Sequence, residues 1–191
     1  LIPCFYGESL VLRILDRKKS LDNFTDLGFT LNQEKDLEKI VNSDAGLILI
    51  CGPTGSGKTT TLSSILSEIQ KLNKKIISIE DPVEYLIPNV TQVQINKKIG
   101  LDFPFLLRNI IRQDPDVIAI GEIRDSETAK IAVQTALTGH LVLATLHTDS
   151  TQDSFFRLVD MGLPSYLLCA VLKWVIVQNL IITTTGRVLN A

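Results

Sequence analysis

The residues from 52 to 61 have the composition and spacing of a phosphate-binding loop. They read Gly-Pro-Thr-Gly-Ser-Gly-Lys-Thr-Thr-Thr and match the pattern of glycine, four residues, glycine, lysine and serine or threonine. Glycines let the backbone turn tightly and bring its N–H groups to phosphate oxygens. Lys58 would reach the β- and γ-phosphates as a point charge, and the Thr59 hydroxyl would bind Mg²⁺. The expected nucleotide-binding residues are Gly52, Pro53, Thr54, Gly55, Ser56, Gly57, Lys58, Thr59 and Thr60.

The segments on either side of this loop have the patterns that a phosphate loop requires. Residues 47–51 form a short, wholly apolar run, which is typical of a buried parallel strand. Residues 60–71 form an amphipathic helix pattern, and its positive end would face the anion. A glycine-rich turn that binds nothing is the alternative, and the order of strand, loop and helix argues against it.

Polar residues follow each of the other apolar runs. Glu80 and Asp81 come after residues 76–79, Glu122 comes after residues 117–120, and His147 comes after residues 141–145. In open α/β sheets, ligands bind beyond the carboxyl ends of the strands. Phosphoryl transfer needs an acidic group near Mg²⁺ and a group that activates the attacking water, and Glu122 and Glu80 suit these two roles. Each carboxylate taken alone could equally be a solvated loop acid.

The remaining patterns predict helices between the strands and therefore an α/β fold. Expected helices run from Asn32, as the capping residue, to about Val41, from Asp102 through Arg108 and Arg112, and over residues 126–138. An exposed or edge strand is expected over residues 90–96, and two further helices after His147. The predicted fold is a RecA-like P-loop NTPase core with a largely parallel sheet.

The chain is expected to be part of a longer protein, since residue 1 is Leu. A strand over residues 10–15 would belong to the end of an amino-terminal domain, here residues 1–17. Residues 18–30 would form a linker, and residues 31–191 an ATPase domain with truncated carboxy-terminal helices.

Composition excludes several classes of protein. A net charge of −2 gives no support for general nucleic-acid binding. The three scattered cysteines suggest reduced thiols in a cytosolic setting, and no signal peptide is recognisable. The longest apolar stretch, from Tyr166 to Val177, is shorter than the roughly 20 residues that span a bilayer. We expect a buried helix there.

Four regions, in order, resemble the signature motifs of the secretion ATPase superfamily of type II secretion, type IV pilus assembly and competence systems. They are the phosphate loop, an aspartate box over residues 79–85, a Walker B region over residues 112–125 and a histidine box over residues 137–148. The similarity covers roughly residues 7–180. Four ordered motifs are highly specific, whereas a phosphate loop alone indicates only an NTPase.

The resemblance implies roles for the residues around the nucleotide. It places Lys58 and Thr59 on the phosphates and Mg²⁺, with Glu122 contacting Mg²⁺ through water. It makes Glu80 the base for the attacking water, although Glu122 competes for that role. It places His140 and His147 near the γ-phosphate or at a contact that couples it to the subunit interface, with structural packing as the alternative.

Four arginines match residues that the family places around the nucleotide or at subunit contacts. A guanidinium group there can stabilise charge on the transferring phosphoryl group. A salt bridge on a helix face is the alternative for two of them, Arg108 and Arg112. The four are Arg13, Arg108, Arg112 and Arg124.

The function implied by the resemblance is a cytoplasmic ATPase, peripheral to the inner membrane, that hydrolyses ATP with Mg²⁺ to power assembly of a type IV pilus or a type II secretion pseudopilus. The implied partners are further copies in a hexameric ring, an inner-membrane platform protein and a cytoplasmic docking protein, with no nucleic acid. The alternatives are a nucleotide-binding structural subunit with little turnover, pilus retraction and a nucleic-acid-dependent motor.

The chain departs from the family pattern near its end. Asn179 stands where the family often has arginine in a Gln-Arg-Leu sequence, which keeps the structural-subunit alternative open. The residues after Leu180 contain no cysteine, whereas assembly ATPases usually continue into a four-cysteine zinc site.

Overall fold

The computed structural model describes residues 2–10, 27–183 and 186–190. Arg13, most of the expected strand over residues 10–15 and residues 18–26 of the expected linker lie outside this range. The proposed division into the end of an amino-terminal domain, a linker and an ATPase domain therefore stays a prediction.

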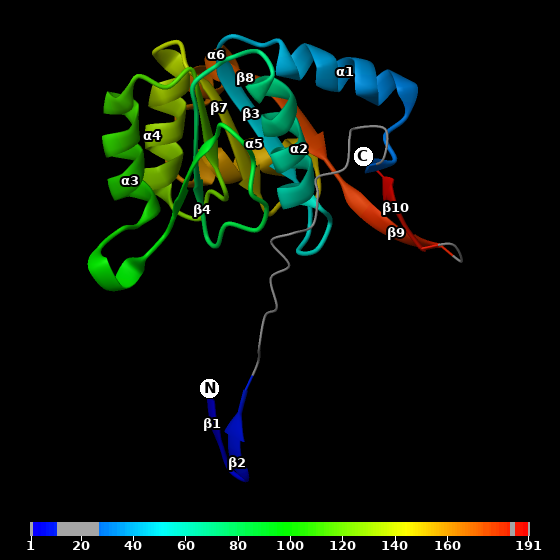
Figure 1. Ribbon diagram of the computed structural model, residues 1–191, viewed down its shortest axis with the longest axis vertical. Helices are drawn as coiled ribbons and strands as arrows, with labels where there is room; N and C mark the ends of the chain where they lie inside the picture. The colour runs from blue at the N-terminus through cyan, green and yellow to red at the C-terminus, as the bar shows by residue number, and fades with distance from the viewer. Residues whose placement is uncertain (1, 11–26, 184–185, 191) are drawn as a thin grey trace.

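A six-stranded sheet forms the centre of the fold, in the order β5-β4-β6-β7-β3-β8, and every neighbouring pair is parallel (Figure 1). The four inner strands are buried along their whole length, which explains their mostly apolar sequences. The expected α/β fold with a largely parallel sheet is confirmed. The strands are β3 Gly46–Cys51, β4 Ile76–Glu80, β5 Thr91–Gln94, β6 Val117–Ile120, β7 Leu141–Leu146 and β8 Leu172–Val177.

Helices cover both faces of this sheet and create two separate cores. α1 (Leu31–Val41) and α2 (Lys58–Gln70) pack on one face, as Figure 1 shows, and α3 (Phe103–Ile110) and α4 (Ser126–Leu137) lie on the other. α5 (Thr151–Asp160) and α6 (Ser165–Val171) contribute to the second core. Side chains alternate along each strand, so Ile48 and Ile50 of β3 face α2 while Leu47 and Leu49 face α4.

Short elements complete the described chain. Two antiparallel hairpins, β1 (Ile2–Cys4) with β2 (Gly7–Ser9) and β9 (Asn179–Thr183) with β10 (Gly186–Asn190), lie near its two ends. Two 3₁₀ turns, η2 (Lys97–Ile99) and η3 (Ile111–Gln113), flank α3. Neither hairpin was expected from the sequence.

The prediction of one buried helix from Tyr166 to Val177 is wrong in its second half. α6 ends at Val171, and Leu172–Val177 forms β8, which pairs in parallel with β3. This half of the stretch holds Trp174 and three consecutive β-branched residues, which favour a strand. The two helices expected after His147 are present as α5 and α6, and the described elements that follow α6 are strands.

Two helix boundaries also differ from expectation. Thr30, not Asn32, caps α1, and it forms a capping box with Gln33, in which each side chain bonds the other residue's backbone N–H. α3 ends at Ile110, so Arg108 lies on the helix while Arg112 lies in the following 3₁₀ turn.

Candidate active site

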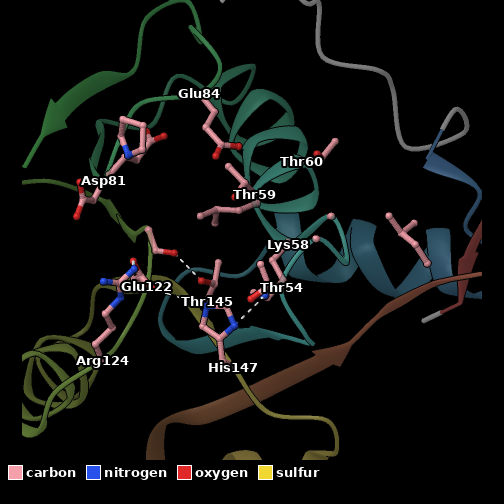
Figure 2. Close-up of a pocket in the computed structure, with 17 residues that line it drawn as sticks. Thr54, Lys58, Thr59, Thr60, Asp81, Glu84, Glu122, Arg124, Thr145 and His147 are labelled. Carbon is pink, nitrogen blue, oxygen red and sulfur yellow. Dashed lines mark hydrogen bonds and ion pairs between the residues drawn. The ribbon is translucent and has the colours of Figure 1, made fainter. Parts of the chain in front are cut away.

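A cavity of about 610 Å³ lies beyond the carboxyl ends of β4, β6 and β7 and is closed on one side by the phosphate loop (Figure 2). Its volume falls within the roughly 300–1,000 Å³ that is usual for ligand pockets. Parallel strands all end at this edge, which brings together residues that are distant in the sequence. The predicted site residues that line the cavity are Thr54, Gly55, Gly57, Lys58, Thr59, Thr60, Glu80, Glu122, Arg124 and His147.

The start of α2 is free to bind an anion at this cavity. Gly57 stands at the N-cap with a φ of 90°, no side chain caps the helix, and its first turn carries no acidic residue. By contrast, a threonine, serine or aspartate side chain caps each of α1, α3, α4 and α5. The first N–H groups of α2 therefore remain as donors, aligned with the positive end of the helix dipole.

Lys58 is the cation of the loop and is almost buried. Its Nζ donates to the carbonyl oxygens of Gly52 and Pro53, both at 2.8 Å, and lies 3.4 Å from Nδ1 of His147. Burial lowers the pKa of Lys58, and the nearby carboxylate of Glu122 opposes that shift. The ammonium group has three protons, and these three acceptors already take them. Phosphate oxygens would therefore replace one or more of these acceptors when they bind Lys58.

The end of β8 supports the back of the loop through Gln178, a residue that is completely buried. Its backbone N–H donates to the Cys51 carbonyl at 3.0 Å, and its side-chain Nε2 donates to the Ser56 carbonyl at 2.7 Å. Among the residues that the structure describes, the Ser56 hydroxyl and Gln178 Oε1 have no hydrogen-bond partner, although both atoms are buried. Gln178 was not singled out from the sequence, and the available signal was an amide side chain directly after an apolar run.

Glu122, Arg124 and His147 lie together at the cavity, and His147 is the member of this group next to Lys58, as Figure 2 shows. Arg124 Nη2 lies 2.5 Å from Glu122 Oε1, and this hydrogen bond raises the pKa of Arg124. Nε2 of His147 lies 3.7 Å from Glu122 Oε2. Burial, followed by the charge of Lys58, lowers the pKa of His147, so its ring is neutral near pH 7. Neutral Nδ1 can then accept from Lys58.

Glu80 is the last residue of β4 and is only 6% exposed. One of its carboxylate oxygens, Oε1, accepts from the Ser78 hydroxyl at 2.6 Å and from Gln92 Nε2 at 2.9 Å. The carboxylate is therefore held by donors from two adjacent strands while the residue lines the cavity.

The structure separates the other predicted site residues from the cavity. His140 precedes β7 and bonds within the turn before it, to the Thr138 hydroxyl and the Thr135 carbonyl. His147 follows β7, and the six residues between them span about 20 Å at 3.3 Å per residue. The expected position of His140 near the γ-phosphate is thus not supported within one chain, and a role at a subunit contact stays a prediction.

Neither described helix-face arginine reaches the cavity. Arg108 forms an ion pair with Glu127, with both side chains more than half exposed, as the salt-bridge alternative had it. Arg112 lies in η3 and is exposed.

The donor set suits Mg²⁺ better than a metal that is bound by protein alone. Among the residues that the structure describes, no three His, Cys, Asp or Glu side chains are grouped to hold a metal ion. Mg²⁺ usually takes one or two protein oxygens and completes its shell with phosphates and water. Thr59 and Glu122 both line the cavity and fit that arrangement.

In the same described residues, no helix is long and apolar enough to cross a bilayer.

Comparison with known proteins places the chain in a family. The sequence model of the family described as "Type II/IV secretion system protein" matches residues 1–187. The chain is 49% identical over 180 residues to type II secretion system protein E of Xanthomonas campestris pv. campestris, which covers 94% of the chain and 32% of the relative. It is 46% identical over 180 residues to the type IV pilus assembly ATPase PilB of Thermus thermophilus, which covers 94% of the chain and 20% of PilB.

A similar solved structure is that of the pilus retraction motor PilT with bound ADP. It superposes with a TM-score of 0.80 at 38% sequence identity and covers 93% of this chain and 53% of PilT. The chain therefore spans between a fifth and about a half of the proteins to which it is compared here.

Proposed function

The chain belongs to the type II/IV secretion system protein family, and from this premise we propose that it is the ATP-hydrolysing part of a motor that assembles a type IV pilus or a type II secretion pseudopilus. The observation that carries the proposal is the convergence of Lys58, Glu80 and Glu122 on one cavity beside an uncapped helix start. The bound ADP of the PilT structure supports a nucleotide as the ligand.

In this proposal, each polar group at the cavity has one task. The loop N–H groups and Lys58 bind the phosphates, while Thr59 and Glu122 hold Mg²⁺, which when bound neutralises charge on the phosphates. Glu80 accepts a proton from the attacking water. Arg124 keeps Glu122 in place through their 2.5 Å contact and adds positive charge near the transferring group.

His147 has a proposed task between the loop and the metal site. Its neutral ring accepts a hydrogen bond from Lys58 on one side and turns Nε2 towards Glu122 on the other. It can therefore respond to movement of either group when the γ-phosphate is present or lost.

For the whole protein, we propose a ring of six copies in the cytoplasm, held at the inner membrane by a platform protein and a cytoplasmic docking protein. The family membership supports assembly with other components of a secretion system. Pilus retraction is the second candidate, since the chain resembles PilT at 38% identity, but the relatives named for secretion and pilus assembly are more similar, at 49% and 46%. Assembly is therefore the preferred function.

The proposal is tested by comparing Glu80→Gln with Glu122→Gln in the full-length protein, with turnover measured against Mg²⁺ concentration. Gln has nearly the shape of Glu but cannot take the proton, so Glu80→Gln should retain nucleotide affinity and lose about 10²- to 10⁴-fold in turnover. Glu122→Gln should instead need more Mg²⁺ for its activity. Near-normal turnover of Glu80→Gln, with Glu122→Gln inactive at every Mg²⁺ level, would transfer the role of base to Glu122.

A further inference from the structure

The pairing of β4 with the edge strand β5 places a row of polar side chains beside the phosphate-loop helix. Ser78 pairs with Gln92 and Glu80 pairs with Gln94 in parallel register. Residues paired in this way point to the same face of the sheet. That face carries α2, because Ile76, two residues before Ser78, belongs to the core that α2 covers.

The Gln92 side chain uses all of its hydrogen-bonding groups except one lone pair. Its Nε2 donates to Glu80 Oε1 at 2.9 Å and to the Tyr85 carbonyl at 2.8 Å, and its Oε1 accepts from the Ile87 backbone N–H at 2.8 Å. A flipped amide would put its oxygen against two acceptors and its nitrogen against a donor. The orientation of the amide is therefore fixed by its neighbours.

These contacts leave Glu80 constrained at one oxygen only. Oε1 accepts from both Gln92 and Ser78, whereas Oε2 accepts no hydrogen bond from any residue that the structure describes. Glu80 lines the cavity, so Oε2 is the oxygen that remains for water. A carboxylate held in this way presents a single free acceptor oxygen, Oε2, in a fixed orientation towards the cavity.

Gln92 also connects Glu80 to the segment between β4 and β5, residues 81–90. Tyr85, whose carbonyl Gln92 holds, has its hydroxyl 3.2 Å from the Thr60 hydroxyl in the first turn of α2. Ile87, whose N–H Gln92 accepts, is buried in the same core as Leu62 of α2. A single amide thus joins the carboxylate, the connecting segment and the phosphate-loop helix.

We propose that Gln92 is the positioning residue of Glu80, holding one carboxylate oxygen so that the other faces the attacking water, in register with the phosphate loop. This inference rests on the proposed role of Glu80 as the base. It assigns a task in the reaction to the edge strand, which contributes no residue to the cavity wall.

Gln94 provides a matched control. It lies on the same strand and the same face as Gln92, and its Oε1 accepts from the Val83 backbone N–H at 3.3 Å, but it makes no hydrogen bond with Glu80. If turnover falls only because the segment between β4 and β5 is weakened, replacing either glutamine should lower it. If turnover falls because Glu80 is misplaced, replacing Gln92 should lower it and replacing Gln94 should not.

The experiment uses the full-length protein with Gln92→Leu, Gln94→Leu and Ser78→Ala, and measures kcat with saturating Mg-ATP and the nucleotide Kd separately. Gln92→Leu is expected to lower kcat about 10- to 100-fold, the range of a misplaced catalytic group, with Kd changed less than about threefold. Gln94→Leu should keep kcat within about twofold. Ser78→Ala removes the other donor to Oε1 without touching the segment, so it should lower kcat in the same direction even if Gln92→Leu fails to fold.

Glu80→Gln, alone and combined with Gln92→Leu, separates the two proposals, with residual turnover followed by radiolabelled ATP. If Gln92 acts through Glu80, the double variant should be no slower than Glu80→Gln by more than about twofold. An inactive Glu80→Gln with near-normal Gln92→Leu and Ser78→Ala would overturn the inference and leave the base assignment intact. Equal losses in Gln92→Leu and Gln94→Leu, or a parallel rise in Kd, would also overturn it. Near-normal turnover of Glu80→Gln would remove the base assignment itself, and the inference with it.

Discussion

Replacement of Gly52 or Gly55 by alanine tests how the phosphate loop is built. Both residues have a positive φ, 144° and 80°, which alanine adopts only at a cost. Their surroundings differ. A Cβ at Gly55 would meet no atom within 4 Å, whereas a Cβ at Gly52 would lie 2.3 Å from the backbone oxygen of Gln178 and 2.6 Å from the Ser56 hydroxyl.

The expected losses of stability follow from these two environments. Alanine in the left-handed region costs about 1–2 kcal/mol, so Gly55→Ala should lose about that much. At Gly52 the backbone term of about 1–3 kcal/mol comes with a steric one, because the loop must move away from β8. That movement breaks the hydrogen bond from Gln178 Nε2 to Ser56, worth about 0.5–1.5 kcal/mol. Gly52→Ala should therefore cost about 1.5–4.5 kcal/mol.

The assay is urea denaturation of both variants in the same full-length background, so that contributions from other parts of the protein cancel. Hydrogen exchange at the Gln178 amide adds a local readout, since this N–H donates to Cys51 behind the loop. Exchange should accelerate in Gly52→Ala and stay unchanged in Gly55→Ala. Equal losses of stability together with equal exchange rates would refute the argument that the close approach of β8 requires glycine at position 52.

Two further predictions concern Lys58 and the cysteines. Lys58→Ala removes a charged donor worth about 1.5–3 kcal/mol, so nucleotide affinity measured by calorimetry should fall at least about tenfold, and an unchanged affinity would contradict the site. Burial raises the pKa of the Cys51 thiol, while Cys4 and Cys169 are exposed, so alkylation at pH 7 followed by peptide mass spectrometry should modify only the exposed pair until the protein unfolds. Equal labelling of Cys51 and Cys169 in the folded protein would show that β3 is open to solvent.

Much of the fold could be predicted because each inner strand can be recognised from its own short stretch of sequence. A strand covered on both faces is expected to be mostly apolar, and β3, β4, β6 and β7 are, with Ser78 and Glu80 in β4 and Thr145 in β7 as the polar exceptions. β8 was missed because a short apolar run fits a buried helix as well as a strand. The segment forms a strand because it pairs with the free edge of β3. The residues of β3 lie more than 100 positions earlier in the chain, so a local sequence pattern does not reveal this pairing.

The candidate site was predictable to the same extent as the sheet. Once the strands are parallel, the residues after them must meet at one edge, which brings Glu80, Glu122 and His147 together. The same geometry separates His140 from His147, because a whole strand lies between two histidines of one motif. Gln92 gave no local signal at all, since its contact with Glu80 depends on the register between β4 and β5.

The contacts around the loop divide it into a fixed back and an exchangeable front. Behind it, Gln178 holds the Ser56 carbonyl and the end of β3 through hydrogen bonds, and the Gln178 side chain is fully buried. In front, Lys58 donates to two carbonyls of the loop itself, and phosphate oxygens are stronger acceptors for an ammonium group than neutral carbonyls. Phosphate binding can therefore proceed by exchange of the acceptors of one side chain while the backbone stays in place. A phosphate loop that is already ordered avoids most of the entropy cost of forming the site on binding, which suits the proposed cycle of nucleotide binding and release.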